Sequence, residues 1–329
     1  MGSDVLVVVL VVVMAMAMPG SWGDSLSNDF YLHTCPSAEG IIQRKMSSWF
    51  RNDSTLAPSI IRLHFHDCAV RGCDASVLLN HQGSERAAQA SKTLRGFNVI
   101  DDIKTELERQ CPGTVSCADI LTAAARDATM LLGGPFWEVP FGRKDGRVSV
   151  GSEAEEFVPR GRENISSLIN FFQSKLGLSV LDMVVLSGSH TIGRSSCSSF
   201  VYSRSPREAP RNPNVLKIDS SYMSRLNSVC SNPSIKRKMR SHFVNLDFAT
   251  PTKFDSQYYA NLGKNMGLLT TDQALVIDQR TAPFVSVLST QQDLFFSQFS
   301  ASMVKLGNII LPSRFAGEVR RQCDVVNAV

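Results

Sequence analysis

The sequence predicts a mainly α-helical protein with little β-structure and four disulfide bonds. Apolar residues recur at intervals of three and four along most of the chain from Ser37 onward, which is the spacing of one helix face. Only the segment from Trp137 to Phe141 alternates as a strand does. With 43% hydrophobic and 19% charged residues, the 329-residue chain is not collagen-like, low-complexity or mostly disordered.

The chain begins with an apolar run of 14 residues, from Val5 to Met18. This run is shorter than the roughly 20 residues that span a bilayer and is typical of a signal-peptide core. We expect a signal peptide over residues 1–23 and one secreted domain over residues 24–329, with an uncleaved membrane anchor as the alternative. The N-x-S triplets at Asn52 and Asn164 are candidate glycosylation sites and agree with secretion.

All eight cysteines follow this leader, and an even number of cysteines in a secreted chain predicts a disulfide framework. Eight cysteines allow about 105 pairings, so their number alone does not choose among them.

Helix signals then follow in order along the chain. A first helix ends at Asn52, and a capping-box pattern at Ser116 and Asp119 opens the clearest helix, which ends at Gly133 and Gly134. The apolar spacing predicts further helices over residues 97–111, 165–176, 179–190 and 295–306. The Pro-rich segment 203–214 is expected to be a long loop.

Arg62 and His66 are four residues apart in the helical segment APSIIRLHFHDC, so their side chains project from one face. This pair suits peroxide chemistry, because a neutral imidazole can move a proton between two oxygens while a guanidinium stabilises the charge that develops. His64 points elsewhere. Taken alone, the pattern favours the simpler interpretation of a buried histidine and a solvated arginine.

Oxygen ligands gather directly after His66, at Asp67, Asp74 and Ser76, where Cys68 and Cys73 can close a tight loop. Calcium takes about six to eight oxygens, so this loop is a candidate ion site. A solvent-facing acidic turn is the alternative.

A second group of oxygen donors consists of Asp247, Thr250 and Asp255. These residues also suit calcium. The local pattern favours a loop with an Asx-type turn and a helix cap at Asp255.

His190 stands at the end of a helix that Ser179 and Asp182 cap, after the small residues Gly188 and Ser189. Small residues permit the close approach of a flat group such as haem. A histidine that binds haem iron normally gives its other N–H to a carboxylate. Spacing alone does not select that carboxylate. On the local pattern alone, a histidine whose hydrogen bonds are satisfied within the core is the better interpretation of His190.

Seven motifs occur in an order that makes the chain resemble the secreted plant haem peroxidases, called class III. The resemblance covers about Phe30 to Cys323, and its motifs are RLHFHDCAVRGCDASVLL, RGFNVIDDIK, CPGTVSCADIL, GGPFWEVPFGRKDG, LSGSHTIGRSSC, TPTKFDSQYY and GLLTTDQAL.

The resemblance implies a mainly helical fold with haem b between a distal and a proximal half. It implies that Arg62 and His66 are catalytic, Phe65 and Glu85 support the distal pocket, and Pro159 lies where donors dock. His190 would bind the iron and Asp272 would bind His190. The implied ligands of two calcium ions are Asp67, Val70, Gly72, Asp74 and Ser76 for the first, and Thr191, Asp247, Thr250, Lys253 and Asp255 for the second. The implied disulfides are Cys35–Cys111, Cys68–Cys73, Cys117–Cys323 and Cys197–Cys230.

The chain departs from the family in one place. Before RGF the family has an asparagine that accepts a hydrogen bond from the distal histidine, whereas Ala90 or Ser91 falls at that position here. The hydroxyl group of Ser91 is a candidate substitute. Loss of an orienting partner slows a general base, so peroxide activation is expected to be slow or supported by another group.

The predicted activity is the reduction of hydrogen peroxide with one-electron oxidation of phenolic donors in the cell wall or extracellular space. Arg160 and Arg162 beside Pro159 lead to the hypothesis that these phenols carry carboxylates. The alternative function is a haem- and calcium-binding wall protein with weak or no turnover, and a calcium-dependent module without haem is a further rival.

A formal charge of +4 is too weak for a dedicated nucleic-acid binder.

A basic run is a candidate contact for acidic wall polysaccharide, with a solvated helix face as the favoured alternative. It contains Lys236, Arg237, Lys238 and Arg240. We expect a monomer with no membrane partner.

Overall fold

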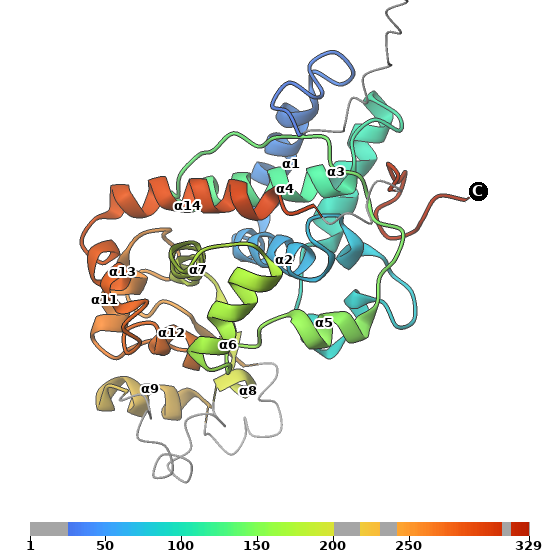
Figure 1. The fold of residues 1–329 in the computed structure, drawn as a ribbon. Coiled ribbons are helices and arrows are strands. Elements are labelled where there is room, and N and C mark those ends of the chain that lie inside the picture. Colours follow the sequence, from blue (N-terminus) through green and yellow to red (C-terminus); the bar gives the residue numbers. More distant parts are fainter. Residues whose placement is uncertain (1–25, 201–217, 231–241, 311–316, 329) are drawn as a thin grey trace, which may run out of the picture.

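The computed structural model describes residues 26–200, 218–230, 242–310 and 317–328. Helices make up most of these residues, as predicted (Figure 1). The predicted signal peptide, the 203–214 loop and the basic run lie outside the described residues.

The first group of helices surrounds α2, which carries Arg62 and His66. Helix α2 packs against α4, and α1 packs against both α3 and α4. The group comprises α1 (Ala38–Asn52), α2 (Leu56–Arg71), α3 (Phe97–Gln110), α4 (Cys117–Leu131) and α5 (Gly151–Phe157), with single turns η1 (Ser76–Leu78), η2 (Glu85–Ala87) and η3 (Gln89–Ser91).

The second group surrounds α7, which leads to His190. Helix α14 packs against α7, and α11 packs against α13. The group comprises α6 (Ile165–Asn170), η4 (Phe171–Lys175), α7 (Val180–Ser187), η5 (Gly188–Thr191), α8 (Cys197–Phe200), α9 (Ser220–Cys230), α11 (Gln257–Gly263), α12 (Thr270–Ala274), α13 (Ala282–Leu288) and α14 (Gln292–Gly307). One cluster of buried hydrophobic side chains, from Tyr31 to Cys323, runs through both groups.

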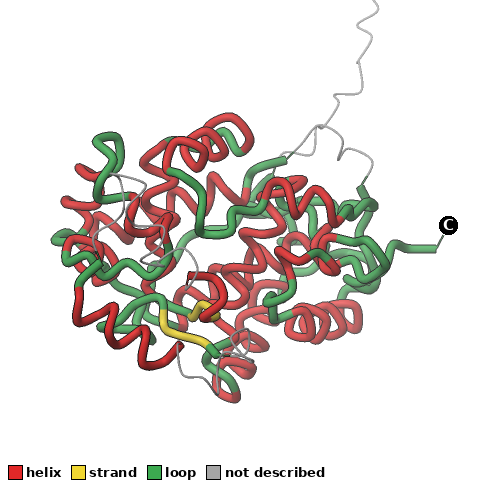
Figure 2. Tube along the Cα trace, turned by 90° about the horizontal axis from the view of Figure 1, so that it is seen from below, coloured by secondary structure: helices red, strands yellow, loops and turns green. Residues whose placement is uncertain are grey.

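The only strands among the described residues are β1 (Arg194–Ser196) and β2 (Phe243–Asn245), which pair antiparallel (Figure 2). The prediction of a strand from Trp137 to Phe141 is wrong. Burial alternates there as expected, with Trp137, Val139 and Phe141 inward. Among the described residues, however, the segment has no partner strand and makes only one isolated bridge, from Phe141 to Ser27. Alternation fixes which face is buried, whereas a strand also needs a neighbour to accept its hydrogen bonds.

Two predicted helices change type along their length. The helix over 165–176 is α-helical to Asn170 and then makes one π-helical turn, η4. The helix over 179–190 is α-helical to Ser187, so His190 lies in the tighter 3₁₀ turn η5. The capping box of Ser179 and Asp182 is present in full.

The predicted capping box at Ser116 and Asp119 is only half formed. Ser116 Oγ accepts from the backbone N–H of Asp119 at 3.1 Å, but the Asp119 carboxylate instead forms a buried ion pair with Arg143 at 2.8 Å. It also accepts from the hydroxyl group of Tyr31. The tertiary ion pair therefore takes the carboxylate away from the helix terminus.

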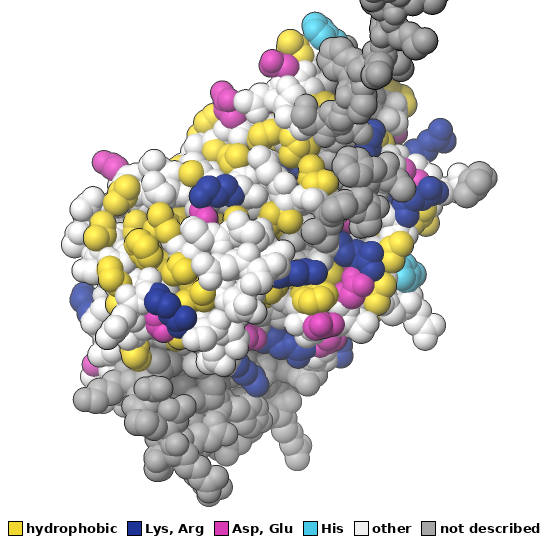
Figure 3. Space-filling model, in the orientation of Figure 1, with side chains coloured by type: hydrophobic (Ala, Val, Ile, Leu, Met, Phe, Trp, Pro, Cys, Tyr) yellow, Lys and Arg dark blue, Asp and Glu magenta, His cyan; other side chains and the backbone are white. Residues whose placement is uncertain are grey.

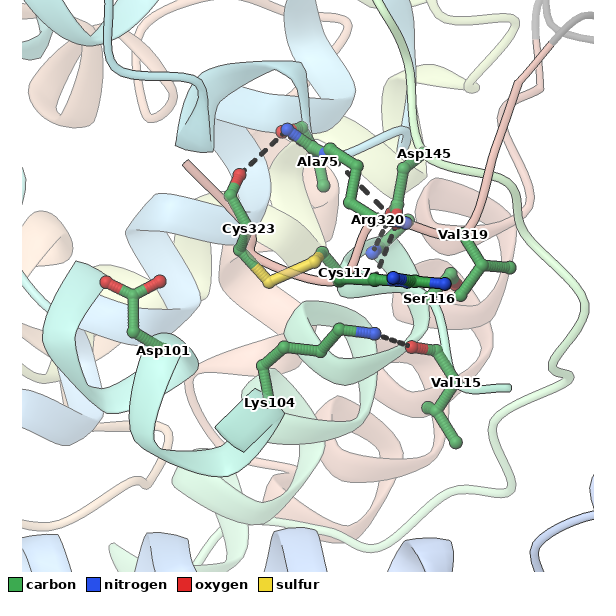
Figure 4. Close-up of a disulfide and its surroundings, with 12 residues drawn as sticks. Ala75, Asp101, Lys104, Val115, Ser116, Cys117, Asp145, Val319, Arg320 and Cys323 are labelled. Atoms are coloured by element: carbon green, nitrogen blue, oxygen red, sulfur yellow. Dashed lines mark hydrogen bonds and ion pairs between the residues drawn. A yellow bond between two sulfur atoms is a disulfide. The ribbon is translucent and has the colours of Figure 1, made fainter. Parts of the chain in front are cut away.

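All four disulfides join the cysteines that the resemblance implies. The Cys117–Cys323 bridge ties the start of α4 to the C-terminal segment, and Figure 4 shows Asp145 and Arg320 beside it. Asp145 accepts from the backbone N–H groups of Cys117 and Ala118 and from that of Arg320. The Arg320 side chain reaches on to the carbonyl oxygen of Ala75 at 2.6 Å.

No single described helix is long and apolar enough to cross a membrane, although the bent pair of segments 165–175 and 180–191 passes that test jointly.

Candidate functional site

The structure places Arg62 and His66 one turn apart on α2, as predicted. His66 is buried, and burial together with the positive charge of Arg62 holds its pKa well below the ordinary value of 6.5. Its imidazole is therefore neutral at physiological pH, which is the form that can accept a proton.

Arg62 is anchored by the loop that follows η3. Its Nη1 donates to Thr93 Oγ1 at 2.9 Å, and its Nη2 lies 3.5 Å from the carbonyl oxygen of Ala90. Water reaches the side chain although protein surrounds most of it, and burial lowers the guanidinium pKa to about 10. Arg62 therefore remains cationic beside the neutral His66.

The family asparagine has no protein substitute among the described residues. His66 Nδ1 and Ser91 Oγ are both buried, and neither has a hydrogen-bond partner. The hypothesis that the Ser91 hydroxyl bonds to His66 is therefore wrong in this structure. Phe65, next along α2, stacks on Phe172 with ring centroids 6.2 Å apart and meets the His66 ring edge-on.

The first group of oxygen donors is buried rather than solvent-facing. Asp67, Asp74 and Ser76 are at most 3% exposed, and the Cys68–Cys73 disulfide closes the loop between them. Asp67 accepts from the backbone N–H of Ala75 at 2.8 Å, in a loop that turns through a left-handed Ala75. The interpretation as an exposed acidic turn is therefore wrong.

Glu85 adds a third carboxylate beside this loop. It is fully buried, and the hydroxyl group of Ser76 is a neighbour that can donate to its carboxylate. Burial, followed by the charge of Asp67, raises its pKa to about 9. So much buried negative charge needs a proton or a cation, and these oxygens fit calcium.

Val70 and Gly72, the two carbonyl ligands that the resemblance implies, flank this loop: Val70 is in the last turn of α2 and Gly72 caps the helix. The carbonyl oxygen of Gly72 accepts from the backbone N–H of Asp74 at 3.0 Å. His64, Cys68 and Cys73 also cluster there, but both cysteines are in a disulfide and cannot bind a metal as thiolates.

His190 meets Asp272, the carboxylate that the resemblance selects. His190 Nδ1 lies 2.7 Å from Asp272 Oδ1, and the carboxylate is 2% exposed. Asp272 Oδ1 also accepts from the hydroxyl group of Tyr258 at 3.0 Å, and Oδ2 accepts from the backbone N–H of Leu269 at 2.9 Å. With Nδ1 engaged, Nε2 of His190 is the nitrogen left to bind a metal, which fits the haem iron that the resemblance implies.

The small residue at position 188 serves a different purpose from the predicted approach of a flat group. A Cβ atom on Gly188 would collide with the hydroxyl group of Tyr259 and with the ring of Phe295. Protein side chains therefore occupy the space over Gly188, and close packing of the core explains the glycine.

The second group of oxygen donors is also a buried cluster. Thr191 Oγ1 lies 3.2 Å from Asp255 Oδ1 and 3.5 Å from Asp247 Oδ2, and Thr250 Oγ1 lies 3.0 Å from Asp255 Oδ1. Burial raises the pKa of Asp247, and the negative charge of Asp255 raises it further. Lys253 is nearby, with Nζ 3.9 Å from Asp255 Oδ2. The expected Asx-type turn is present, because Asp247 Oδ1 accepts from the backbone N–H groups of Ala249 and Thr250. Asp255 Oδ1 also accepts from the backbone N–H of Gln257, the first residue of α11, as the expected cap does. The two carboxylates and two hydroxyl groups that gather around this turn are oxygens of the kind that calcium takes.

The segment around Pro159 is half-buried, and its two arginines already have partners. Arg160 forms an ion pair with Glu155, whose other oxygen accepts from the backbone N–H of Ala90 at 3.1 Å. Arg162 donates to the carbonyl oxygens of Ser198 and Ser199. These contacts weigh against the hypothesis that both guanidinium groups are free to bind a carboxylate donor.

Both candidate glycosylation residues are exposed. Asn52 is the last residue of α1, and Asn164 caps α6 by accepting from the backbone N–H of Ser167. On the face in Figure 3, Lys and Arg side chains lie scattered among Asp and Glu rather than in one patch.

Sequence reasoning assigned no role to two residues at the site, Thr93 and Tyr258. Tyr258 lies in the quoted motif TPTKFDSQYY, but nothing in that string indicates which hydroxyl group turns toward Asp272. Both contacts join residues that are distant in the chain, so local patterns carry no signal for them.

Comparisons with known proteins agree with this architecture. The family model described as Peroxidase matches residues 42–291. Peroxidase 7 of Arabidopsis thaliana is 47% identical over 306 residues, covering 92% of this chain and 85% of that protein. Peroxidase 3 of Arabidopsis thaliana is 43% identical and covers 92% of each chain. Peroxidase 2 of Oryza sativa subsp. japonica is 42% identical and covers 97% of this chain and 98% of its own.

Proposed function

The chain belongs to the peroxidase family, and on this premise we propose that Arg62 and His66 activate hydrogen peroxide while His190 holds the haem iron. Family membership makes the protein a peroxidase, which reduces hydrogen peroxide with electrons from a donor. The observation that supports these residue roles best is the pair of histidine environments, one neutral beside a cation and one bonded to a buried carboxylate.

In the proposed distal step, the His66 imidazole takes a proton from one oxygen of hydrogen peroxide and returns it to the other. Arg62 stabilises the negative charge on the departing oxygen, since its guanidinium stays cationic and is held by Thr93. Phe65 shields the pocket, and Glu85 supports it from the calcium side.

On the proximal side, Asp272 holds the proton on His190 Nδ1 and so directs Nε2 to the metal. Haem b supplies the iron redox chemistry when it is bound. Asp272 increases the electron donation of His190, which favours peroxide cleavage.

The two buried oxygen clusters are proposed to bind one calcium ion each, with the ligand sets that the resemblance implies. The first ion would join the end of α2, which carries His66, to the loop that contains Ala75. Arg320 already holds Ala75, so the ion would make the end of α2 more rigid. The second ion would fix Thr191, which directly follows His190.

The donors are proposed to be small phenols that dock near Pro159.

We also propose that the chain is exported after removal of residues 1–23 and carries glycans on Asn52 and Asn164. Residues 24–329 would form a monomeric domain, and the basic run would retain it on acidic polysaccharide. The last idea predicts that salt releases the protein from pectate; retention that salt does not weaken contradicts it.

A stopped-flow experiment tests the residue roles. The haem-loaded protein is mixed with hydrogen peroxide, and the Soret band is followed against peroxide concentration. We expect a rapid, peroxide-dependent change that a phenol reverses, and a loss of about 10²- to 10⁴-fold in His66→Ala. His33→Ala, at an exposed histidine, is the matched control. A normal haem spectrum that barely responds to peroxide would favour a binding protein, and failure to take up haem would contradict the role of His190.

A further inference from the structure

Tyr258 shares the carboxylate oxygen that holds His190. Its hydroxyl group lies 3.0 Å from Asp272 Oδ1, the same atom that lies 2.7 Å from His190 Nδ1. The Tyr258 and His190 rings meet edge-on, with centroids 6.2 Å apart. Tyr258 comes from α11 and Asp272 from α12, so two elements converge on this atom.

The Asp272 carboxylate depends on protein donors, because it is 2% exposed. It accepts from three groups, and two of them compete for Oδ1. Each donor withdraws some negative charge from the oxygen it binds, so a second donor weakens the first hydrogen bond. The phenol of Tyr258 remains a donor throughout the physiological range, since burial and then the charge of Asp272 raise its pKa well above 10.

We propose that Tyr258 is a positioning residue that sets how strongly Asp272 polarises His190, and thereby tunes the electron donation of His190 to the haem iron. The inference rests on the proposed role of His190. A neighbouring carboxylate makes a metal-binding histidine more basic, and the Tyr258 hydroxyl moderates that effect.

The adjacent tyrosine provides a matched control. Tyr259 is as buried as Tyr258, but its hydroxyl group faces the backbone carbonyl oxygens of Val184 and Val185 at 3.1 and 3.3 Å. Both Tyr→Phe changes remove one buried hydroxyl group from α11, and only one of these groups contacts Asp272.

The experiment compares Tyr258→Phe with Tyr259→Phe in the haem-loaded protein. In Tyr258→Phe we expect a higher iron–histidine stretching frequency in the resonance Raman spectrum of the ferrous form and a more negative reduction potential. In Tyr259→Phe we expect neither shift. Equal shifts in both variants, or no shift in Tyr258→Phe, would overturn the proposal.

A second measurement does not depend on haem. In the apoprotein, the NMR resonance of the His190 Nδ1 proton should move downfield in Tyr258→Phe, because its bond to Asp272 strengthens. If the proton resonance shifts but no variant shows an iron–histidine band, His190 is not the iron ligand. The tuning of the iron is then refuted, while the sharing of Asp272 stands. An unmoved resonance would refute the sharing of Asp272.

Two further variants keep the test decisive. Adding Tyr258→Phe to Asp272→Ala should leave the stretching frequency of the single variant unchanged, and an additional shift would show that Tyr258 acts by another route. Where Tyr258→Phe does not fold, difluorotyrosine at position 258, a stronger donor, should lower the frequency; an unchanged or raised frequency would overturn the proposal.

Discussion

The hydroxyl group of Tyr259 occupies the space where a Cβ atom at residue 188 would lie. Gly188 begins the turn that carries His190, and the absence of a Cβ atom there leaves room for the side chains of Tyr259 and Phe295. The packing next to the turn that carries His190 thus depends on a residue that has no side chain.

Replacing Gly188 by alanine should therefore destabilise the protein. Overpacking of a buried site costs about 1–3 kcal/mol, because Tyr259 and Phe295 have to move. Denaturant unfolding measures this loss. Gly263→Ala is the control, since a Cβ atom there meets nothing within 4 Å. Equal stability of the two variants would contradict the packing argument.

The rate of the peroxide reaction should stay level as the pH falls through 6.5. A protonated imidazole cannot accept a proton, so the rate drops only below the pKa of His66, which burial and Arg62 hold well under 6.5. Stopped-flow measurement across the acid range gives the profile. A midpoint near 6.5 would mean that His66 is solvated in the working enzyme or is not the base.

Ser91→Ala should leave the peroxide rate unchanged. Ser91 Oγ is buried without a hydrogen-bond partner, so its removal takes no support from His66 and relieves an unpaired polar group. Stability should be equal or slightly higher in thermal unfolding. A tenfold loss of rate would reveal a link to His66, for example through a water molecule.

Glu155→Gln should increase the preference for carboxylate-bearing phenols. The change removes the negative partner of Arg160 but retains an amide oxygen for the backbone N–H of Ala90. The ratio of kcat/KM for ferulate to that for coniferyl alcohol should rise. The double variant Glu155→Gln/Arg160→Ala should lose the gain, and a gain that persists would assign it to another group.

Asp255→Asn should remove one of two calcium ions. Asp255 is buried and lies within 3.2 Å of the hydroxyl groups of Thr191 and Thr250. The calcium content per chain, measured by metal analysis, should fall from two ions to one. Added calcium should also stabilise this variant less than the wild type. An ion present at 100 times its Kd contributes about 2.7 kcal/mol. Asp278→Asn, outside both clusters, should retain two ions, and two ions in Asp255→Asn would contradict the second site.

The sequence predicted the helices well because their signals are local. The apolar spacing and the serine cap of α4 lie within one stretch of chain, as do Arg62 and His66, which are four positions apart. The segment from Trp137 to Phe141 shows the limit of this reasoning, since its alternation reports burial but not the presence of a partner strand.

The site was predicted less completely because it is built from long-range contacts. Asp272 lies 82 residues from His190, and only resemblance to a family selected it among the other acids. No pattern indicates that Tyr258 shares its oxygen or that Thr93 holds Arg62. Such contacts depend on how α11, α12 and the loop after η3 pack, which one-dimensional spacing does not encode.

The bridge between Cys117 and Cys323 has a consequence for the order in which the molecule is made. Its two halves are 206 residues apart, so nearly the whole chain is synthesised before the bond can form. Until then Arg320 is absent, the buried Asp145 lacks its countercharge, and the Ala75 carbonyl beside the first oxygen cluster lacks its donor. The loop from Cys68 to Ser76 is therefore among the last parts to mature, and a chain that ends before Arg320 lacks one of the contacts that hold this loop.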